Sequence, residues 1–130
     1  MKEKPVRIIL EWDGVPPSTN RVWRNAGGKT YLAPETKRYR AKVAAEMFGA
    51  LPSPWMWVGV EIELSPPDRR RFDIDNRTKA LFDALTACGF WWDDECVTEH
   101  RVTRSEPVQG GRTRLEIYDA REKYRRIDRG

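Results

Sequence analysis

The residues best suited to chemistry lie in one segment, RRRFDIDNRTKALFDAL, at positions 69–85. It places Asp73 and Asp75 two positions apart, after three arginines and ahead of Lys79. Alternate side chains of an extended segment share one side, so we expect these carboxylates to point together. Adjacent carboxylates repel unless a cation lies between them, and oxygen ligands suit Mg²⁺, for which Mn²⁺ may substitute. We therefore predict a divalent-cation site, with Lys79 near enough to contact a bound phosphate.

A second acidic group, Asp93, Asp94 and Glu95, follows the same predicted helix. If tertiary packing brings it back to the first group, several carboxylates would surround a metal beside a rim of arginines. Such a site suits phosphodiester hydrolysis, because a bound metal lowers the pKa of its water and stabilises charge on the transferring phosphoryl group. Zinc and His-dependent nucleophilic catalysis are disfavoured, because His100 is the only histidine and has no partner at ligand spacing.

The same residues also fit interpretations other than a metal site. Mixed charges in a loop commonly form a solvated face, in which the arginines only balance the carboxylates. A D-x-D pair also occurs in glycosyltransferases, which are far longer, and in haloacid-dehalogenase-type phosphatases, which carry an apolar strand where this chain has Arg-Arg-Arg-Phe. The segment AGGKT resembles the end of a P-loop, but Trp23 stands where the first glycine is required, so no nucleotide cofactor is expected. Charge and spacing alone leave the solvated face open.

The elements that must position these residues alternate between strand-like and helix-like patterns. Strands are predicted over 6–12, 55–64, 96–104 and 112–118, helices over 35–51 and 76–88, and a long loop over 14–34. The last two strands should form a hairpin around the turn PVQGG. The segment FDID is expected to be extended, with Asp75 or Asn76 as the N-cap of the second helix. Phe72 is interpreted as a core residue beneath the site, with a DNA wedge as the alternative.

The order β-α-β-α-β-β predicts an α/β (α+β) fold, a small single domain with a mixed β-sheet and two main helices. A chain of 130 residues can bury one core. We assign residues 1–120 to this domain and residues 121–130 to a charged C-terminal tail that should fray.

The composition bears on partners and location. The net charge of +4 is a modest indication of nucleic-acid binding. No apolar run approaches the ~18 residues that a membrane span needs, so no association with a membrane is expected. We also see no secretory signal, and we therefore expect a cytoplasmic location. Reduced thiols at Cys88 and Cys96 fit that location. A second basic set fills the early loop and the following helix: Arg21, Arg24, Lys29, Lys37, Arg38 and Arg40.

Three blocks of the sequence together resemble the RusA family of Holliday junction resolvases. They are PPSTNRVWR, GKTYLAPETKRYR and PPDRRRFDIDNRTKALFDALTACGFWWDDECV, spread over about residues 16–104 in the order and spacing of the family. The long central block is specific, whereas the first loop would be weak alone. The resemblance implies a small α/β subunit that works as a homodimer, uses Mg²⁺ and nicks four-way branched DNA symmetrically.

Carried over by position, the resemblance makes Asp73, Asp75 and Asp94 metal-binding and catalytic, with Lys79 as their basic partner. Asp93 either contacts metal, directly or through water, or faces away. Asp83 is interpreted as a structural partner of Lys79, four positions along the helix. The residues expected to contact DNA are Asn20, Arg21, Arg24, Lys29, Arg69, Arg70 and Arg71.

The main hypothesis is a Mg²⁺-dependent endonuclease that resolves Holliday junctions by paired symmetric nicks in recombination and repair. Two alternatives stay open: a nuclease with a broader preference for flaps and forks, and a junction-binding protein that does not cleave. The broader nuclease would use the same residues as the main hypothesis, so the sequence does not separate the two. The presence of the whole acidic set and of Lys79 argues against the non-cleaving protein.

Overall fold

The computed structural model describes residues 6–18 and 23–121 and centres on a four-stranded sheet. The strands are β1 (Arg7–Asp13), β4 (Val58–Ser65), β5 (Val97–Arg104) and β6 (Arg112–Asp119). Their order is β1-β6-β4-β5. β6 pairs antiparallel with β1 and with β4, whereas β4 and β5 are parallel. The mixed sheet predicted from the sequence is therefore confirmed.

The predicted hairpin between the last two strands is wrong, because β4 lies between β5 and β6. The connecting segment crosses the end of β4, where the Ser105 amide donates to the Leu64 carbonyl and the Val108 amide to the Pro66 carbonyl. Turn residues show where a chain reverses but not which strand it pairs with. β4 is the most buried strand, and it takes a central place.

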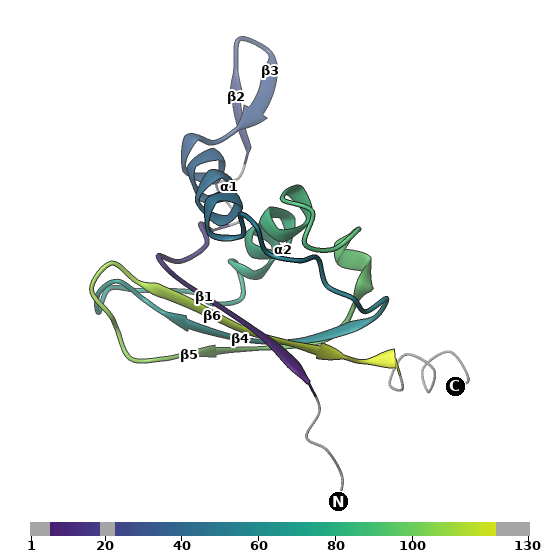
Figure 1. Cartoon of the computed structure of the whole chain (residues 1–130). Coiled ribbons are helices and arrows are strands. Elements are labelled where there is room, and N and C mark those ends of the chain that lie inside the picture. The colour runs from purple at the N-terminus through teal and green to yellow at the C-terminus, as the bar shows by residue number, and fades with distance from the viewer. Residues whose placement is uncertain (1–5, 19–22, 122–130) are drawn as a thin grey trace, which may run out of the picture.

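A second sheet contains only β2 (Trp23–Ala26) and β3 (Lys29–Leu32), which pair antiparallel. The sequence predicted a loop here. Gly27 and Gly28 form the turn with φ values of 56° and 76°, in the region that two-residue hairpin turns favour. Figure 1 shows this hairpin extending away from the four-stranded sheet, beyond α1. The Gly-Gly pair was the signal that the sequence interpretation missed.

Two helices, α1 (Pro34–Glu46) and α2 (Thr78–Ala87), cover one face of the four-stranded sheet (Figure 1). α1 ends five residues before the predicted Leu51, and Gly49 follows it at a φ of 81°. Tyr39 and Val43 lie on its buried face, and Met47, just beyond its end, is also buried. Within the described ranges, no helix has both the length and the apolar character needed to cross a membrane.

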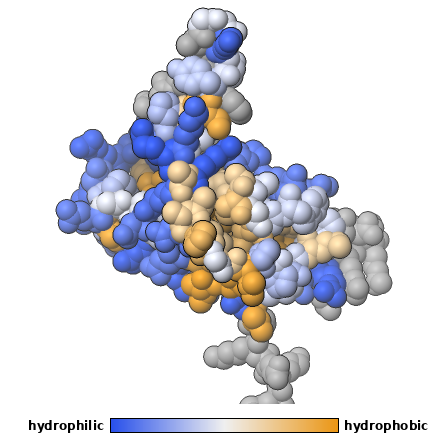
Figure 2. All heavy atoms as spheres, turned by 45° about the horizontal axis from the view of Figure 1, so that its top comes forward, coloured by the Kyte–Doolittle hydropathy of each residue, from blue (hydrophilic) through white to orange (hydrophobic). Residues whose placement is uncertain are grey.

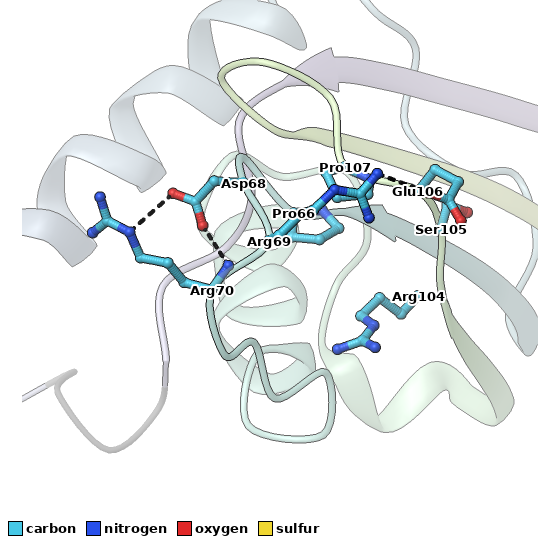
Figure 3. A pocket seen from close by; sticks show the side chains of 8 residues that line it. All are labelled: Pro66, Asp68, Arg69, Arg70, Arg104, Ser105, Glu106 and Pro107. Carbon is cyan, nitrogen blue, oxygen red and sulfur yellow. Dashed lines mark hydrogen bonds and ion pairs between the residues drawn. The ribbon is translucent and has the colours of Figure 1, made fainter.

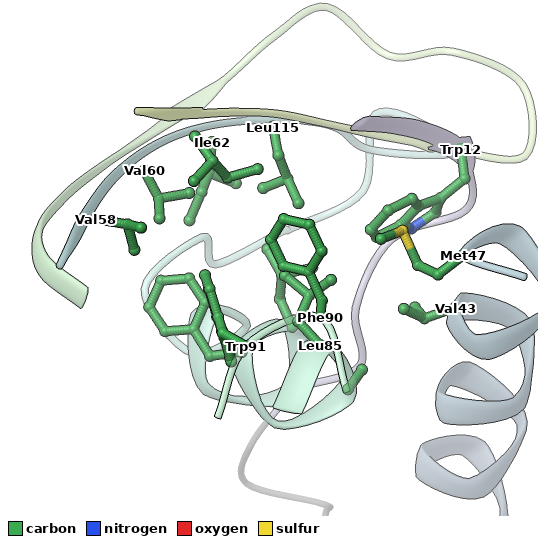
Figure 4. Packing of buried hydrophobic residues seen from close by; sticks show 14 of the residues in the cluster. Trp12, Val43, Met47, Val58, Val60, Ile62, Leu85, Phe90, Trp91 and Leu115 are labelled. Carbon is green, nitrogen blue, oxygen red and sulfur yellow. The ribbon is translucent and has the colours of Figure 1, made fainter. Parts of the chain in front are cut away.

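The hydrophobic core lies between this helical layer and the sheet (Figure 4). Leu81 and Leu85 of α2 and Ile62 and Leu115 of the sheet are almost fully buried. Burying each such side chain contributes roughly 1.5–3 kcal/mol. The core therefore holds α2, the helix that carries Lys79, firmly against the sheet.

Exposed apolar and polar groups are separated on the helical side of the molecule. Figure 2 shows hydrophilic side chains around the base of the β2–β3 hairpin and an apolar patch farther from it. The segment after α1 contributes three large exposed side chains, Phe48, Leu51 and Met56.

Candidate active site

The first acidic segment turns into α2 instead of running extended. Ile74 lies in a bend, Asp75 begins a turn, and the helix starts at Thr78. The extended geometry predicted for Asp75 is therefore wrong, and so is the predicted N-cap. The cap position is Arg77, and among the described residues no side chain donates or accepts a capping bond there. A turn so close to the helix start allows no alternating strand geometry.

The second acidic segment returns to α2 through aromatic packing. The Phe82 and Trp91 rings meet edge to face with centroids 5.5 Å apart, and the Trp91 indole donates to Thr86 Oγ1 at 2.8 Å. Asp93 then caps a short 3₁₀ helix, η2 (Asp94–Cys96), by accepting a bond from the Glu95 amide at 2.9 Å. The side chain of Asp93 thus already has a structural role at this turn.

Lys79 contacts one residue of the second acidic segment and one of its own helix. Its Nζ lies 2.9 Å from Asp94 Oδ2 and 3.0 Å from Asp83 Oδ1. The hydrogen bond from Lys79 is the main cause that lowers the pKa of Asp94, and the bonds to Asp94 and then Asp83 raise the pKa of Lys79. At neutral pH this places a cation against an anion. The expected pairing of Asp83 with Lys79 is confirmed. The second acidic group returns to Lys79 of α2, but within the described residues it forms no three-carboxylate cluster with Asp73 and Asp75.

Asp75 and Lys79 line one hollow of about 530 Å³ between α2 and β5. Its other walls are mainly apolar and include Ile74, Phe82 and Val102. This hollow thus contains two of the four predicted catalytic residues.

Asp73 lies on a different side of the turn. Its Oδ2 is 3.8 Å from Arg71 Nε, and it is not among the residues that line the hollow containing Asp75. Within residues 6–18 and 23–121, no three acidic, His or Cys side chains gather closely enough to hold an ion. Mg²⁺ typically keeps several waters and uses one or two carboxylates together with substrate phosphate. The oxygen donors at Asp75 and Asp94 suit that mode of binding better than a closed protein cage.

A basic hollow of about 810 Å³ lies next to the acidic segments. Its residues come from the N-terminal loop, α1 and the arginine-rich loop: Pro17, Ser18, Glu35, Arg38, Arg70, Arg71 and Arg77. Four arginines facing one groove form a site suited to phosphate oxygens. Arg70 and Arg71 were predicted from the sequence. Arg38 was noticed only as part of a basic helix, and Arg77 was not singled out at all.

The three consecutive arginines do not act as one group. Figure 3 shows Arg70 and Arg69 extending to opposite sides, Arg70 toward α1 and Arg69 toward Glu106. Arg69 is 3.9 Å from Glu106, and Arg70 Nε is 3.5 Å from Asp68. Arg69 lines a smaller hollow of about 250 Å³ with Arg104 and Ser105. The basic hollow therefore depends on Arg70 and Arg71 and does not include Arg69.

The remaining predicted DNA contacts lie in or near the hairpin. Lys29 is exposed at the start of β3. Asn20 and Arg21 lie outside the described residues, and so does the side chain of Arg24. Phe72 is only 7% exposed and packs with the core, which confirms its interpretation as a core residue.

Comparison with known proteins identifies the family of the chain. The family model described as Endodeoxyribonuclease RusA matches residues 13–118. The crossover junction endodeoxyribonuclease RusA of Enterobacteria phage 82 is 44% identical over 112 residues, which cover 85% of this chain and 91% of the relative. The protein of that name from Escherichia coli K12 has the same identity and coverage, and that of Shigella sonnei is 43% identical. The chain therefore belongs to the RusA family of endodeoxyribonucleases.

Proposed function

We propose that this chain is a Mg²⁺-dependent endonuclease that resolves four-way DNA junctions by paired symmetric nicks. The observation that carries the proposal is the contact of Lys79 with Asp94, which brings the second acidic segment to the helix that follows the first. A separate hollow lined by four arginines supplies positive charge for a nucleic acid. Family membership supports DNA as the substrate, and the names of the relatives specify crossover junctions.

In this proposal Asp75 and Asp94 supply carboxylate oxygens for the metal, and Asp93 keeps its structural bond to the Glu95 amide. Asp73 is added to the metal ligands on the family resemblance alone. A bound metal would lower the pKa of a water molecule and stabilise charge on the phosphoryl group. Lys79 stays protonated because its hydrogen bonds to Asp94 and Asp83 raise its pKa. Its ammonium can therefore stabilise negative charge on the phosphate without acting as a base.

The basic hollow supplies the electrostatic contacts to the DNA backbone. Arg38, Arg70 and Arg71 can each bind a phosphate through charge-assisted hydrogen bonds. Two matched cuts on a two-fold symmetric junction call for two equivalent sites, which a C₂ homodimer provides. We therefore propose that two copies of the chain act together on one junction.

Cleavage of an end-labelled four-way junction tests the proposal, with linear duplex and a flap as control substrates and with or without Mg²⁺. Paired symmetric nicks on the junction alone are expected. Asp75→Asn keeps the size of the side chain but removes its charge, and it should abolish the nicks. Equal cutting of all three substrates would instead indicate a broader branched-DNA nuclease. Tight junction binding without any cut, in Mg²⁺ and in Mn²⁺, would indicate a non-cleaving junction-binding protein.

A further inference from the structure

Arg77 connects the first acidic segment to a distant part of the chain. Its Nε donates to the carbonyl oxygen of Asp73 at 3.2 Å, and its Nη1 donates to the carbonyl oxygen of Pro16 at 2.8 Å. The guanidinium carbon lies 3.9 Å from the centroid of the buried Phe72 ring. One planar side chain thus holds two backbone carbonyls, which lysine, with a single nitrogen, cannot reproduce in the same fork geometry.

The Pro16 end of this connection is firmly held. Pro16 is almost fully buried, and the preceding Gly14 amide donates to the Gly111 carbonyl at 2.9 Å. Thr113 Oγ1 donates to the Gly14 carbonyl at 2.8 Å. The start of the N-terminal loop is therefore attached to β6 and the turn before it, and Arg77 extends this attachment to Asp73.

The Asp73 end has few other supports. Asp73 and Asp75 are exposed and Ile74 is half-buried. Among residues that the structure describes, no side-chain cap closes the start of α2. Without the Arg77 side chain, the turn would keep two supports, the buried Phe72 and the backbone hydrogen bond from the amide of residue 77 to the Ile74 carbonyl. The position of the two carboxylates thus depends strongly on the guanidinium.

We propose that Arg77 is a positioning residue that fixes the Asp73–Asp75 turn for cation binding by fastening the Asp73 carbonyl to the Pro16 loop. The inference rests on the proposed function, in which these carboxylates hold a divalent cation. Groups that orient metal ligands from outside the ligand set typically change metal affinity about 10- to 100-fold when they are removed.

A competing role is phosphate binding, because Arg77 also lines the basic hollow. The two roles predict opposite effects on a cation. Loss of a positive charge near Asp73 and Asp75 strengthens cation binding by electrostatics, whereas loss of positioning weakens it. Arg38 offers a matched control, because it lines the same hollow from α1.

The test measures Mn²⁺ binding to the full chain by electron paramagnetic resonance in the absence of DNA, together with kcat and KM for junction cleavage. Arg77→Met should weaken Mn²⁺ binding about tenfold or more and lower kcat, with little change in KM. Arg77→Lys keeps the charge but can donate to only one carbonyl at a time, and it should show intermediate affinity. Arg38→Met should raise KM and leave Mn²⁺ binding unchanged.

Unchanged or tighter Mn²⁺ binding by Arg77→Met would overturn the inference, as would a defect confined to KM like that of Arg38→Met. If Arg77→Met does not fold by circular dichroism, Arg77→Lys decides, and full Mn²⁺ affinity in that variant overturns the inference. The proposed function is judged separately, by cleavage with the wild-type chain. A wild-type chain that binds Mn²⁺ but cuts no junction would contradict the function and leave the role of Arg77 standing. Absence of Mn²⁺ binding to the wild-type chain without DNA would overturn the inference, whereas junction cleavage by the same chain would still decide the proposed function.

Discussion

The Nζ of Lys79 donates a hydrogen bond to Oδ2 of Asp94, fifteen positions along the chain, at 2.9 Å. This contact joins the start of α2 to η2 and places an ammonium between two carboxylates, since Asp83 lies on its other side at 3.0 Å. The edge-to-face packing of Phe82 and Trp91 makes the contact possible, because it brings the segment after α2 back to the helix.

Removing the ammonium should change the titration of Asp94. The hydrogen bond from Lys79 is the largest cause of its lowered pKa, so Lys79→Met should raise the pKa of Asp94. A depressed folded-state pKa means that the ion pair stabilises the folded chain above the ordinary aspartate pKa. That stabilisation is lost as the pH falls through the lowered value. Carboxyl ¹³C NMR titration measures the shift, and Lys79→Arg serves as the control that retains a cation. An identical Asp94 titration in the wild-type and Met variants would refute this prediction.

Asp83 should contribute little to stability and to cleavage, although it contacts Lys79. It accepts from Lys79 within one helix, and its Oδ2 is 3.9 Å from Arg40 Nη2. Pairs of this kind near the surface contribute about 0.2–1 kcal/mol. We therefore expect Asp83→Asn to lower the free energy of unfolding by less than about 1 kcal/mol and to reduce cleavage only modestly. Urea denaturation and junction cleavage measure the two effects. Complete loss of cleavage in a folded Asp83→Asn variant would show that Asp83 belongs to the catalytic set.

Much of this cluster could be predicted from the sequence. A helix was predicted over residues 76–88, and the spacing of four positions predicted the pair between Lys79 and Asp83. The return of Asp94 could not be derived from periodicity, because it depends on how Trp91 packs against Phe82. Only the resemblance to the RusA family implied that Asp94 belongs to the site.

Other features of the fold and the site could not be predicted from the sequence. The Arg77 bonds go to backbone carbonyls, and one of them is 61 positions away, so no residue type at the other end marks the contact. The place of β4 between β5 and β6 depends on competition among strands for the core, whereas the turn residues between β5 and β6 indicated only a reversal. In contrast, the β2–β3 hairpin was predictable, because a two-residue Gly-Gly turn is a recognised hairpin signal.

Gly59 should be a sensitive position in the sheet. A Cβ at this residue would overlap the ring of Tyr118, its partner across β4 and β6. That ring cannot move away easily, because its hydroxyl donates to Glu99 and the Arg7 guanidinium stacks on it at 4.6 Å. Gly59→Ala should therefore destabilise the chain by about 1–3 kcal/mol, the range typical of overpacking.

Thermal and urea unfolding of Gly59→Ala measure this destabilisation. Tyr118→Ala alone measures the free energy of unfolding lost with the ring. The Gly59→Ala/Tyr118→Ala double variant should lose less free energy of unfolding than the sum of the two single variants. Additive losses would mean that the overlap with Tyr118 does not cause the effect.

The salt dependence of junction binding should separate the neighbouring arginines. Arg71 lines the basic hollow, whereas Arg69 extends toward Glu106 in a different hollow, although both are more than 80% exposed. Each phosphate neutralised by a side chain adds about 0.9 to the slope of log binding constant against log salt concentration. Arg71→Ser should therefore reduce the slope by about 0.9, and Arg69→Ser should leave it nearly unchanged. Binding in Ca²⁺, measured by fluorescence anisotropy at several salt concentrations, tests both variants. Equal reductions for the two would show that DNA reaches the Glu106 side as well and would extend the interface across both hollows.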